Sequence, residues 1–542
     1  MKIDFYFNEQ FTHSHEESSE LLRLPIPAPT QAGLFEIRFS IPILDMQSYW
    51  MPECRVPSSK LHWRIECNSA AQRYFPFLSF FNLEQENRCS VAVSNLYDDC
   101  RIRAFMNQER GTYDLCISIC VTPQSGSFEL LVDRRKLLWT ECLTQYRQQL
   151  NIALPKFPAG AWQAVYCTWY AVHASVTQDW VEENAALAAK LGFGTLIIDD
   201  GWCFDVMKRV TPQALTDWYE HIGDWEVSKS KFPDFENHVQ RVRAMGLNYL
   251  LWVSPFLIGA RSQLYQEIKQ ACSTTYHEGY HLLNVKEKEV AEKVLNKIVR
   301  LLEIYPIDGL KIDFLDQYWP DISEPRGRAT LDFIANMSSR IRALRPEALI
   351  EFRQGYTNLA MLPHATQFRA GDVPFDFLDN LLRLAQIRLS MGDHIPIHAD
   401  PVYWHPAESD VNISRHMIAS LVGVPMLSMQ LSGISPREIA IISHWLNFYQ
   451  EHLELFQKGK WQIRYYQSQL LYVSVTLQKQ SIFFVNCANS LPKILQQCSH
   501  NMHILNLSAE TLQVDNCQSY DCQGEKHQNG CIPPGGRGSV RR

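Results

Sequence analysis

The sequence predicts an α/β fold in which a (β/α)8 TIM barrel is flanked by two β domains. Its 542 residues exceed the roughly 250 to 300 residues at which a single core stops growing. Short apolar strands alternate with amphipathic helices in the middle of the chain, as in such a barrel, and β-rich runs lie on both sides. The predicted domains are an N-terminal β-sandwich at 1–150, the barrel at 160–435, a C-terminal β domain at 436–510 and a disordered tail at 511–542.

The N-terminal part favours an antiparallel sandwich because short β-rich runs alternate with polar turns from about residue 35 to 135. A stretch with helical periodicity follows, and a segment with two prolines and a glycine then forms a linker. The runs are "LFEIRFSIPI", "KLHWRIEC", "SVAVSNL", "YDLCISICVT" and "FELLVD", the helical stretch is "KLLWTECLTQYRQQLN", and the linker is "IALPKFPAGAW".

The barrel region offers eight candidate strands, which are "VYCTWY", "TLIIDD", "YLLWVS", "HLLNV", "GLKIDF", "ALIEFRQ", "TQFRAGD" and "IPIHAD". Amphipathic helices are expected near 176–190, 234–245, 286–303, 329–344 and 376–390. Further helices are expected around 409–422 and 436–458, before the β-rich pieces of the C-terminal domain. The tail is rich in Gly, Gln and Pro without apolar periodicity, which favours disorder.

Composition and charge exclude several classes of partner. A net charge of −7 with 20% charged residues does not suggest nucleic acid or an anionic membrane. No signal-like start and no run of about 18 apolar residues occur. The fifteen cysteines are scattered and show no zinc-finger spacing. This pattern is typical of buried thiols in a reducing compartment. We therefore expect a cytoplasmic protein with a neutral substrate, and self-association into a homo-oligomer is left open.

The stretch "GLKIDFLDQ" at 309–317 places Lys311 and Asp313 on one face of a predicted core strand. Each charge costs several kcal/mol to bury unless it is paired, so a structural ion pair is one interpretation. Functional groups of such barrels lie at the C-terminal ends of the strands, and charges end five of the eight candidates, which favours a shared site. These groups are Asp199 and Asp200, Lys311 and Asp313, Glu351 and Arg353, Arg369 and Asp372, and His398 and Asp400.

Four tryptophans at or just after strand ends fit the same site: Trp169, Trp202, Trp225 and Trp252. Singly, each is typical of core or rim packing, but as a set they favour stacking on a sugar. Several carboxylates with few cations also suit an uncharged, polyhydroxylated ligand. Glycoside hydrolysis commonly uses two carboxyl groups flanking the scissile bond, and Lys311 would keep a neighbouring carboxylate ionised, as a nucleophile requires.

Five segments together resemble the melibiase group, the α-galactosidases of glycoside hydrolase family 36 in clan D. They are "TLIIDDGW", "GDWEVSKSKFP", "GLNYLLWVSPF", "GLKIDF" and "FRAGDVP", and the similarity spans roughly 160–460. The resemblance implies an N-terminal β-supersandwich, a catalytic (β/α)8 barrel and a C-terminal β domain. It also implies a retaining α-galactosidase that acts on a small carbohydrate without cofactor or metal.

Residue by residue, the resemblance makes Asp313 the nucleophile and Lys311 a contact to sugar hydroxyls. Asp199 and Asp200 are expected to hold the O4 and O6 hydroxyls, with Trp202 alongside.

The acid/base aspartate falls on Asp372, with Arg369 as its partner. Because Asp372 has the opposite strand parity to Arg369, it is expected in the loop just past the strand. One departure stands out: "EFRQGYTN" replaces the family's Cys-x-Ser-Gly-Gly-Gly stretch, so that Arg353 and Tyr356 are bulky where Gly allows close approach. Either this loop follows another path, or the substrate differs from plain galactose near C2. Arg353 is expected to face C2, and a structural pair with Glu351 is the alternative.

Three other functions remain open at this point. A metal-dependent hydrolase could use His394, His398 and Asp400, although the first strand has no His-x-His pair. A transglycosidase of the same clan, or an α-glycosidase for a 2-substituted galactose-like sugar, would use the same carboxylates. A non-catalytic sugar-binding relative is disfavoured because both candidate carboxylates are present.

Overall fold

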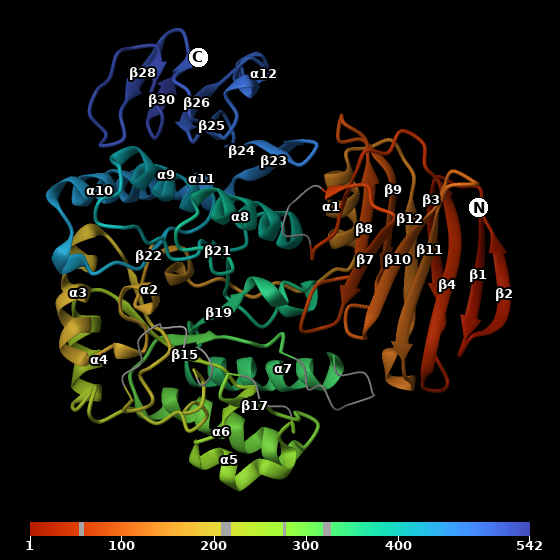
Figure 1. Ribbon diagram of the computed structural model, residues 1–542, viewed down its shortest axis with the longest axis horizontal. Helices are drawn as coiled ribbons and strands as arrows, with labels where there is room; N and C mark the ends of the chain where they lie inside the picture. Colours follow the sequence, from red (N-terminus) through yellow and green to blue (C-terminus); the bar gives the residue numbers. More distant parts are fainter. Residues whose placement is uncertain (54–58, 207–217, 275–277, 318–326, 542) are drawn as a thin grey trace.

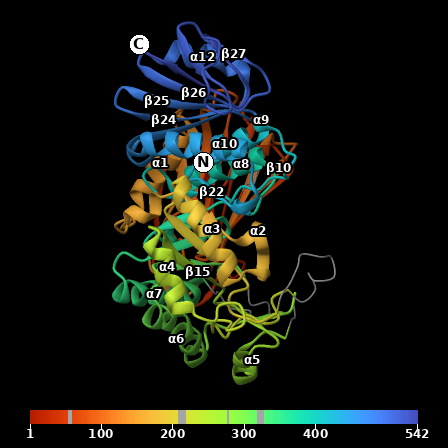
Figure 2. The same ribbon diagram turned by 90° about the vertical axis from the view of Figure 1, so that its left-hand side faces the viewer.

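The computed structural model describes residues 1–53, 59–206, 218–274, 278–317 and 327–541. Figure 1 shows a β-sandwich beside a barrel, with a further sheet at the end of the chain. That last sheet lies over α8 (Phe377–Met391), α9 (Asp410–Ser420) and α10 (Pro436–Glu451), and the turned view in Figure 2 keeps it on the same side of these helices.

The N-terminal region is a sandwich of two six-stranded antiparallel sheets, as the alternating pattern predicts. In β11, buried and half-buried residues alternate along the whole strand, which gives the sheet one face for the core. One sheet has the order β2 (Gln10–Glu16), β1 (Lys2–Phe7), β4 (Gly33–Pro42), β11 (Thr112–Val121), β10 (Cys100–Asn107) and β7 (Arg64–Ser69). The other has the order β3 (Leu21–Ile26), β12 (Phe128–Asp133), β9 (Asn87–Val93), β8 (Phe77–Phe81), β5 (Ser48–Trp50) and β6 (Ser59–Lys60). Helix α1 (Trp139–Gln149) leads from the sandwich to the barrel.

Eight parallel strands form the barrel, which confirms the predicted α/β barrel fold. Their order is β21 (Ile397–His398), β20 (Gln367–Arg369), β19 (Leu349–Arg353), β18 (Gly309–Ile312), β15 (Asn248–Val253), β14 (Thr195–Ile198), β13 (Val165–Cys167) and β22 (Met426–Leu427). A parallel bridge from His398 to Val424 nearly closes the ring. The helices predicted between the strands are present as α3 (Gln178–Leu191), α4 (Phe235–Ala244), α6 (Lys288–Ile304), α7 (Gly327–Leu344) and α8.

One of the eight predicted barrel strands is wrong. "HLLNV" contributes β17 (Tyr280–Leu282), which pairs with β16 (Leu257–Gly259) in a separate two-stranded sheet. The missing strand is β22, which pairs with β13. A two-residue strand carries no readable period, and only its pairing with the first strand reveals it.

The barrel interior has an apolar floor and a charged mouth. Inward-facing side chains from five of the strands make a small apolar cluster that includes Val165, Ile197, Leu250, Leu349 and Met426. Two residues further along each strand the same face points inward again, so the positions above this floor lie at the carboxyl ends of the strands. That is where the predicted charged residues occur.

The sandwich also holds one of the loops at the barrel mouth. Asn358, in the loop after β19, is buried, and its Nδ2 donates to the carbonyl oxygens of Ala70, Tyr74 and Leu96 at 2.8, 2.9 and 3.0 Å. The segment that leaves β19 after Arg353 is therefore anchored to the N-terminal domain.

The C-terminal residues 511–541 are folded, so the prediction of a disordered tail is wrong. The sheet has the order β23 (Lys460–Tyr466), β24 (Gln469–Leu477), β25 (Gln480–Val485), β26 (Asn501–Asn506), β30 (Arg537–Val540) and β28 (Cys517–Tyr520), and β27 (Leu512–Gln513) pairs with β29 (Cys531–Ile532). Single apolar residues of these short strands, including Ile532 and Val540, enter a core shared with α12 (Leu491–Gln497). Isolated buried residues between Gly, Gln and Pro give no periodic signal. The other predicted domain boundaries remain predictions.

Across the described residues, every helix is too short or too polar to cross a lipid bilayer.

The folded tail can be tested with Ile532→Ala. Ile532 is completely buried, and removing a buried Ile side chain typically lowers the free energy of unfolding by about 2–5 kcal/mol. We expect a lower unfolding midpoint and faster proteolysis in the C-terminal region, whereas Gln513→Ala, at an exposed neighbouring position, should change neither. Identical midpoints for both variants and the wild type would contradict an ordered tail.

Candidate active site

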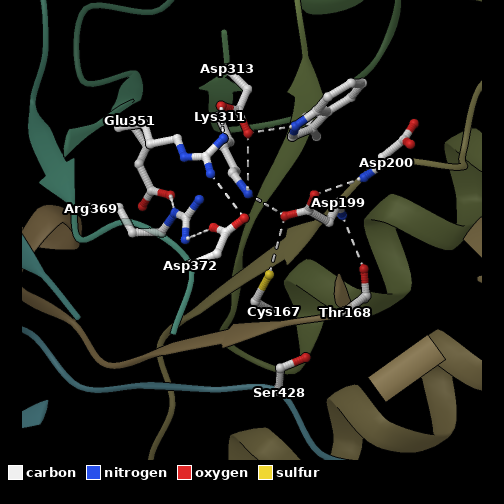
Figure 3. Close-up of polar contacts among 12 residues, drawn as sticks. Cys167, Thr168, Asp199, Asp200, Lys311, Asp313, Glu351, Arg369, Asp372 and Ser428 are labelled. Carbon is white, nitrogen blue, oxygen red and sulfur yellow. Dashed lines mark hydrogen bonds and ion pairs between the residues drawn. The ribbon is translucent and has the colours of Figure 1, made fainter. Parts of the chain in front are cut away.

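The predicted site residues meet at the carboxyl ends of the barrel strands (Figure 3). Most of their side chains are buried, whereas those of Arg353 and Asp372 are 23% and 41% exposed. The elements that supply them are β14 (Asp199 follows it), β15 (Trp252), β18 (Lys311, with Asp313 just after its end), β19 (Glu351 and Arg353) and β20 (Arg369). Asp372 lies three residues past β20, in the loop that its parity predicted.

Lys311 is buried between two carboxylates, that of Asp313 at the end of its own strand β18 and that of Asp199 after β14, with β15 between these two strands. Its Nζ lies 2.5 Å from Oδ2 of Asp199 and 3.9 Å from Oδ2 of Asp313. Burial alone would lower the pKa of Lys311, but the two carboxylates hold that pKa above its ordinary value. Asp199 also accepts hydrogen bonds from the thiol of Cys167 and the backbone N–H of Asp200, at 3.4 and 3.0 Å. The predicted Lys311–Asp313 pair is thus part of a larger group in which Asp199 is the closer partner.

Asp313 is held ionised in spite of its burial. Burial alone would raise the pKa of its carboxyl, but Arg353, Lys311 and Arg369 together hold the pKa well below its usual value. Nη1 of Arg353 donates to Oδ1 at 3.2 Å, and the indole N–H of Trp252 donates to Oδ2 at 3.1 Å. The carboxylate is therefore charged and held from both oxygens, as a nucleophile must be.

The same arginine also reaches Asp372. Nη2 of Arg353 donates to Oδ2 of Asp372 at 2.9 Å, and Nη1 of Arg369 donates to Oδ1 at 3.1 Å. These two cations more than offset burial and lower the pKa of Asp372. One guanidinium, that of Arg353, therefore spans the two carboxylates that the sequence singled out. Tyr356, the other bulky residue of this loop, turns inward, and its hydroxyl donates to the carbonyl oxygen of Ile312.

Asp200 is buried with one unused oxygen. Trp218 Nε1 donates to its Oδ2 at 3.2 Å, whereas Oδ1 has no hydrogen-bond partner among the residues that the structure describes. Burial, together with the neighbouring Asp199, raises the pKa of Asp200 to about 7. A buried carboxyl oxygen without a partner is costly, and a hydroxyl group of a ligand would satisfy it.

The side chains of Trp202 and Trp252 are buried. Trp202 Nε1 donates to the carbonyl oxygen of Trp252 at 2.9 Å, and the ring of Trp225 packs against both indoles. In this arrangement Trp252 acts on Asp313 through its N–H group. The predicted contacts of both tryptophans with a substrate remain predictions.

Two aromatic residues near Asp313, namely Phe314 and Tyr219, were not identified from the sequence. Phe314 follows Asp313 directly and has a left-handed backbone with φ of 57°, which is uncommon for a bulky residue and tends to occur at functional sites. Its ring lies 5.4 Å from the guanidinium carbon of Arg353, and the ring of Tyr219 packs edge-on against it at 5.4 Å. The available signal was an aromatic residue directly after the predicted nucleophile. Tyr219 and Trp218 lie in a loop without periodicity, so no pattern indicated them.

A buried lysine secures the loop that follows β14. The Nζ of Lys231 donates to the carbonyl oxygens of Ala174, Gly201 and Val206 at 2.8, 2.7 and 2.9 Å. Burial lowers its pKa to about 8. The loop that begins with Asp199 and Asp200 is tied to the loop after β13 through this one ammonium group.

The residues considered for a metal site point to other partners. His398 is buried, and its Nε2 contacts the carbonyl oxygen of Ala161 at 2.8 Å, whereas His394 Nδ1 contacts that of Gln457 at 3.1 Å. Within the described ranges, no three His, Cys, Asp or Glu side chains are grouped to hold a metal ion.

Residues 144–331 match the Melibiase family model. Alpha-galactosidase Mel36A of Lactobacillus acidophilus is 28% identical over 155 residues, and alpha-galactosidase AgaA of Geobacillus stearothermophilus is 26% identical over 152 residues. Each alignment covers 27% of this chain and 20% of the relative, so the chain matches about a fifth of the length of these proteins.

Solved structures resemble the whole chain. The GH36 alpha-galactosidase AgaA from G. stearothermophilus, in complex with 1-deoxygalactonojirimycin, has a TM-score of 0.69 at 14% identity, over 99% of this chain and 81% of that one. The alpha-galactosidase from Lactobacillus brevis has a TM-score of 0.67 at 13% identity, over 100% and 80%. At such identities the likeness shows the fold. Together with the family match, it confirms the resemblance to glycoside hydrolase family 36.

The role of Lys231 can be tested with Lys231→Met. Three carbonyl oxygens, two of them buried, would lose their donor, and each buried unsatisfied group costs about 1–3 kcal/mol. We expect the free energy of unfolding to fall by at least about 2 kcal/mol, measured by denaturant titration. Lys229→Met, at an exposed position two residues earlier, is the matched control and should match the wild type. If both variants unfold like the wild type, Lys231 does not hold these loops together.

Proposed function

We propose that this chain, which resembles the melibiase-type α-galactosidases of family 36, is a retaining α-glycosidase that cleaves terminal α-galactosides. Asp313 is the nucleophile and Asp372 the acid/base. The observation that supports this assignment best is the pair of carboxylates bridged by Arg353. A shared guanidinium favours the short separation of a retaining pair, about 5 to 5.5 Å, over the roughly 6.5 to 9.5 Å of an inverting pair.

Substrate binding is assigned to the polar groups on the other side of Asp313. Asp199 and Asp200 accept hydrogen bonds from sugar hydroxyls, and Lys311 donates to a sugar oxygen. The buried, unpartnered Oδ1 of Asp200 supports this role. A site whose polar groups remain unpaired without the matching hydroxyl discriminates strongly between sugars.

The chemistry takes place in two displacements. In the first, a carboxylate oxygen of Asp313 attacks the anomeric carbon, and the bond from that carbon to the leaving oxygen breaks as Asp372 gives it a proton. In the second, Asp372 removes a proton from water, whose oxygen attacks the anomeric carbon and releases Asp313. Two inversions at one carbon give net retention.

Arg353 has to move during this reaction. Its guanidinium lies between the two carboxylates, where the anomeric carbon must come. It also keeps Asp372 ionised, whereas the first step needs Asp372 to carry a proton. We therefore place Arg353 beside the sugar's C2 in the substrate complex, turned away from Asp372. An α-glycosidase for a 2-substituted galactose-like sugar, or a transglycosidase, remains compatible with this role.

The two aspartates can be separated by their chemistry. With p-nitrophenyl α-galactoside, the wild type should release galactose of retained anomeric configuration. NMR of the first product identifies the anomer. Asp313→Ala should abolish turnover of every substrate, because no glycosyl-enzyme can form. Asp372→Ala should show a burst followed by slow turnover, because a good leaving group needs little protonation whereas water still needs a base.

Azide distinguishes the two variants further. With Asp372→Ala it should restore turnover and give a galactosyl azide of retained configuration, whereas with Asp313→Ala it should give at most the inverted azide. Inverted galactose from the wild type, or the same azide product from both variants, would refute these roles.

Arg353→Gly tests the arginine's part in sugar selection. If Arg353 faces C2, the ratio of kcat/KM for aryl α-galactoside to that for aryl α-N-acetylgalactosaminide should change by about tenfold or more, the effect of one lost hydrogen bond to a charged group. Arg241→Gly removes an exposed arginine of α4 that pairs with Glu182 on α3, away from the barrel mouth, and it should leave the ratio unchanged. An unchanged ratio in Arg353→Gly would leave this residue a structural role only.

A further inference from the structure

The carboxylate of Asp372 shares its second cation with another buried carboxylate. Nη1 of Arg369 donates to Oδ1 of Asp372 at 3.1 Å and also to Oδ1 of Asp400, which follows β21. Arg369 and Asp400 are both buried, whereas Asp372 is partly exposed. A single guanidinium nitrogen therefore serves one carboxylate that faces the site and one that lies behind it.

Asp400 also holds the backbone of the loop that carries Asp372. Its Oδ2 accepts the N–H of Val373, the next residue after Asp372, at 2.7 Å, and the hydroxyl of Tyr170 at 2.9 Å. The main chain of Asp400 is anchored in turn, because Asn380 of α8 donates to its carbonyl oxygen at 3.1 Å and accepts its N–H at 3.2 Å. Through Asp400 the loop is tied to the body of the barrel.

We propose that Asp400 is a positioning residue for the acid/base, which holds the 372–373 loop by its backbone and draws part of the charge of Arg369 away from Asp372. This role rests on the proposed function of Asp372. Asp400 does not touch the substrate; it acts through Arg369 and Val373.

The charges around this pair give the direction of the effect. Asp400 is faced by Arg369 from β20, by Asp372 from the following loop and by Tyr170 from α2 (Trp169–Val172), and Arg369 is also 3.9 Å from Glu351 of β19. When Asp400 is ionised, it repels a negative charge on Asp372 and occupies Arg369, and both effects favour the protonated acid that the first displacement needs. When Asp400 is neutral, Arg369 interacts mainly with the carboxylate of Asp372. The pKa of Asp372 then falls, and it gives up its proton more readily.

Asp400 changes charge in the range in which such an enzyme would work. Burial raises its pKa to about 7, although Arg369 opposes this shift. The support from Asp400 is therefore complete above that pH and is lost as the pH falls through it, because the carboxyl then becomes neutral. Loss of the Asp400 charge should therefore lower the pKa of Asp372. Removal of Arg353 should raise that pKa instead, because Arg353 itself lowers it.

The experiment compares Asp400→Asn with the wild type on two substrates. Asn keeps the shape and an acceptor oxygen for Val373, but it removes the charge. On raffinose, which has a poor leaving group, we expect the alkaline limb of kcat/KM to move down by about one pH unit, which is about tenfold lower activity on that limb. On p-nitrophenyl α-galactoside, which needs little protonation, the loss should stay below about threefold.

Two further variants complete the test. Tyr170→Phe removes only the hydroxyl that donates to Asp400 and should move the limb in the same direction by less; it decides the matter if Asp400→Asn does not fold. Asp376→Asn, a matched change at the N-cap of α8, should keep the wild-type profile because Asn also caps helices well.

The outcomes separate the two proposals. Equal losses on both substrates with unmoved pH profiles would show that Asp400 is merely structural and would overturn the inference, while the proposed function would stand. No turnover of either α-galactoside by the wild type would overturn the proposed function and this role with it.

Discussion

Buried charges of alternating sign hold the mouth of this barrel in shape. A single buried ion is strongly destabilising, and even a pair is stable only with good geometry and further hydrogen bonds. Here each of the three cations, Lys311, Arg353 and Arg369, contacts at least two carboxylates. Across the barrel the order is Asp199, Lys311, Asp313, Arg353, Asp372, Arg369 and Asp400, with Glu351 beside Arg369.

The position of this network follows from the pleat of the strands. Alternate side chains point inward, so a strand can supply an apolar residue to the floor and, two positions later, a polar one to the mouth. Leu349, Glu351 and Arg353 on β19 show the whole sequence from floor to mouth. The floor supplies apolar packing beneath the ion network.

The loops at the mouth are held by groups far away in the sequence. Lys231 joins the loops after β13 and β14, Asn358 joins the segment after β19 to the sandwich, and Asp400 holds the loop after β20. Arg353 differs from these groups, because its side chain is partly exposed and contacts carboxylates rather than backbone.

The sequence by itself determined the fold class, the interstrand helices and the strand ends at which the candidate site residues lie. Periodicity marks long elements such as α6, and a Lys and an Asp one residue apart in a core strand stand out because buried charges are rare. The sequence could not indicate β22 or the folded tail, because two-residue strands and single buried residues leave no period. It also paired Lys311 with Asp313 by proximity along the chain. Only the tertiary structure decided that Asp199 is the nearer partner of Lys311, that Arg353 spans Asp313 and Asp372, and that Asp400 shares Arg369. These contacts join different strands of the barrel, whose residues are far apart in sequence.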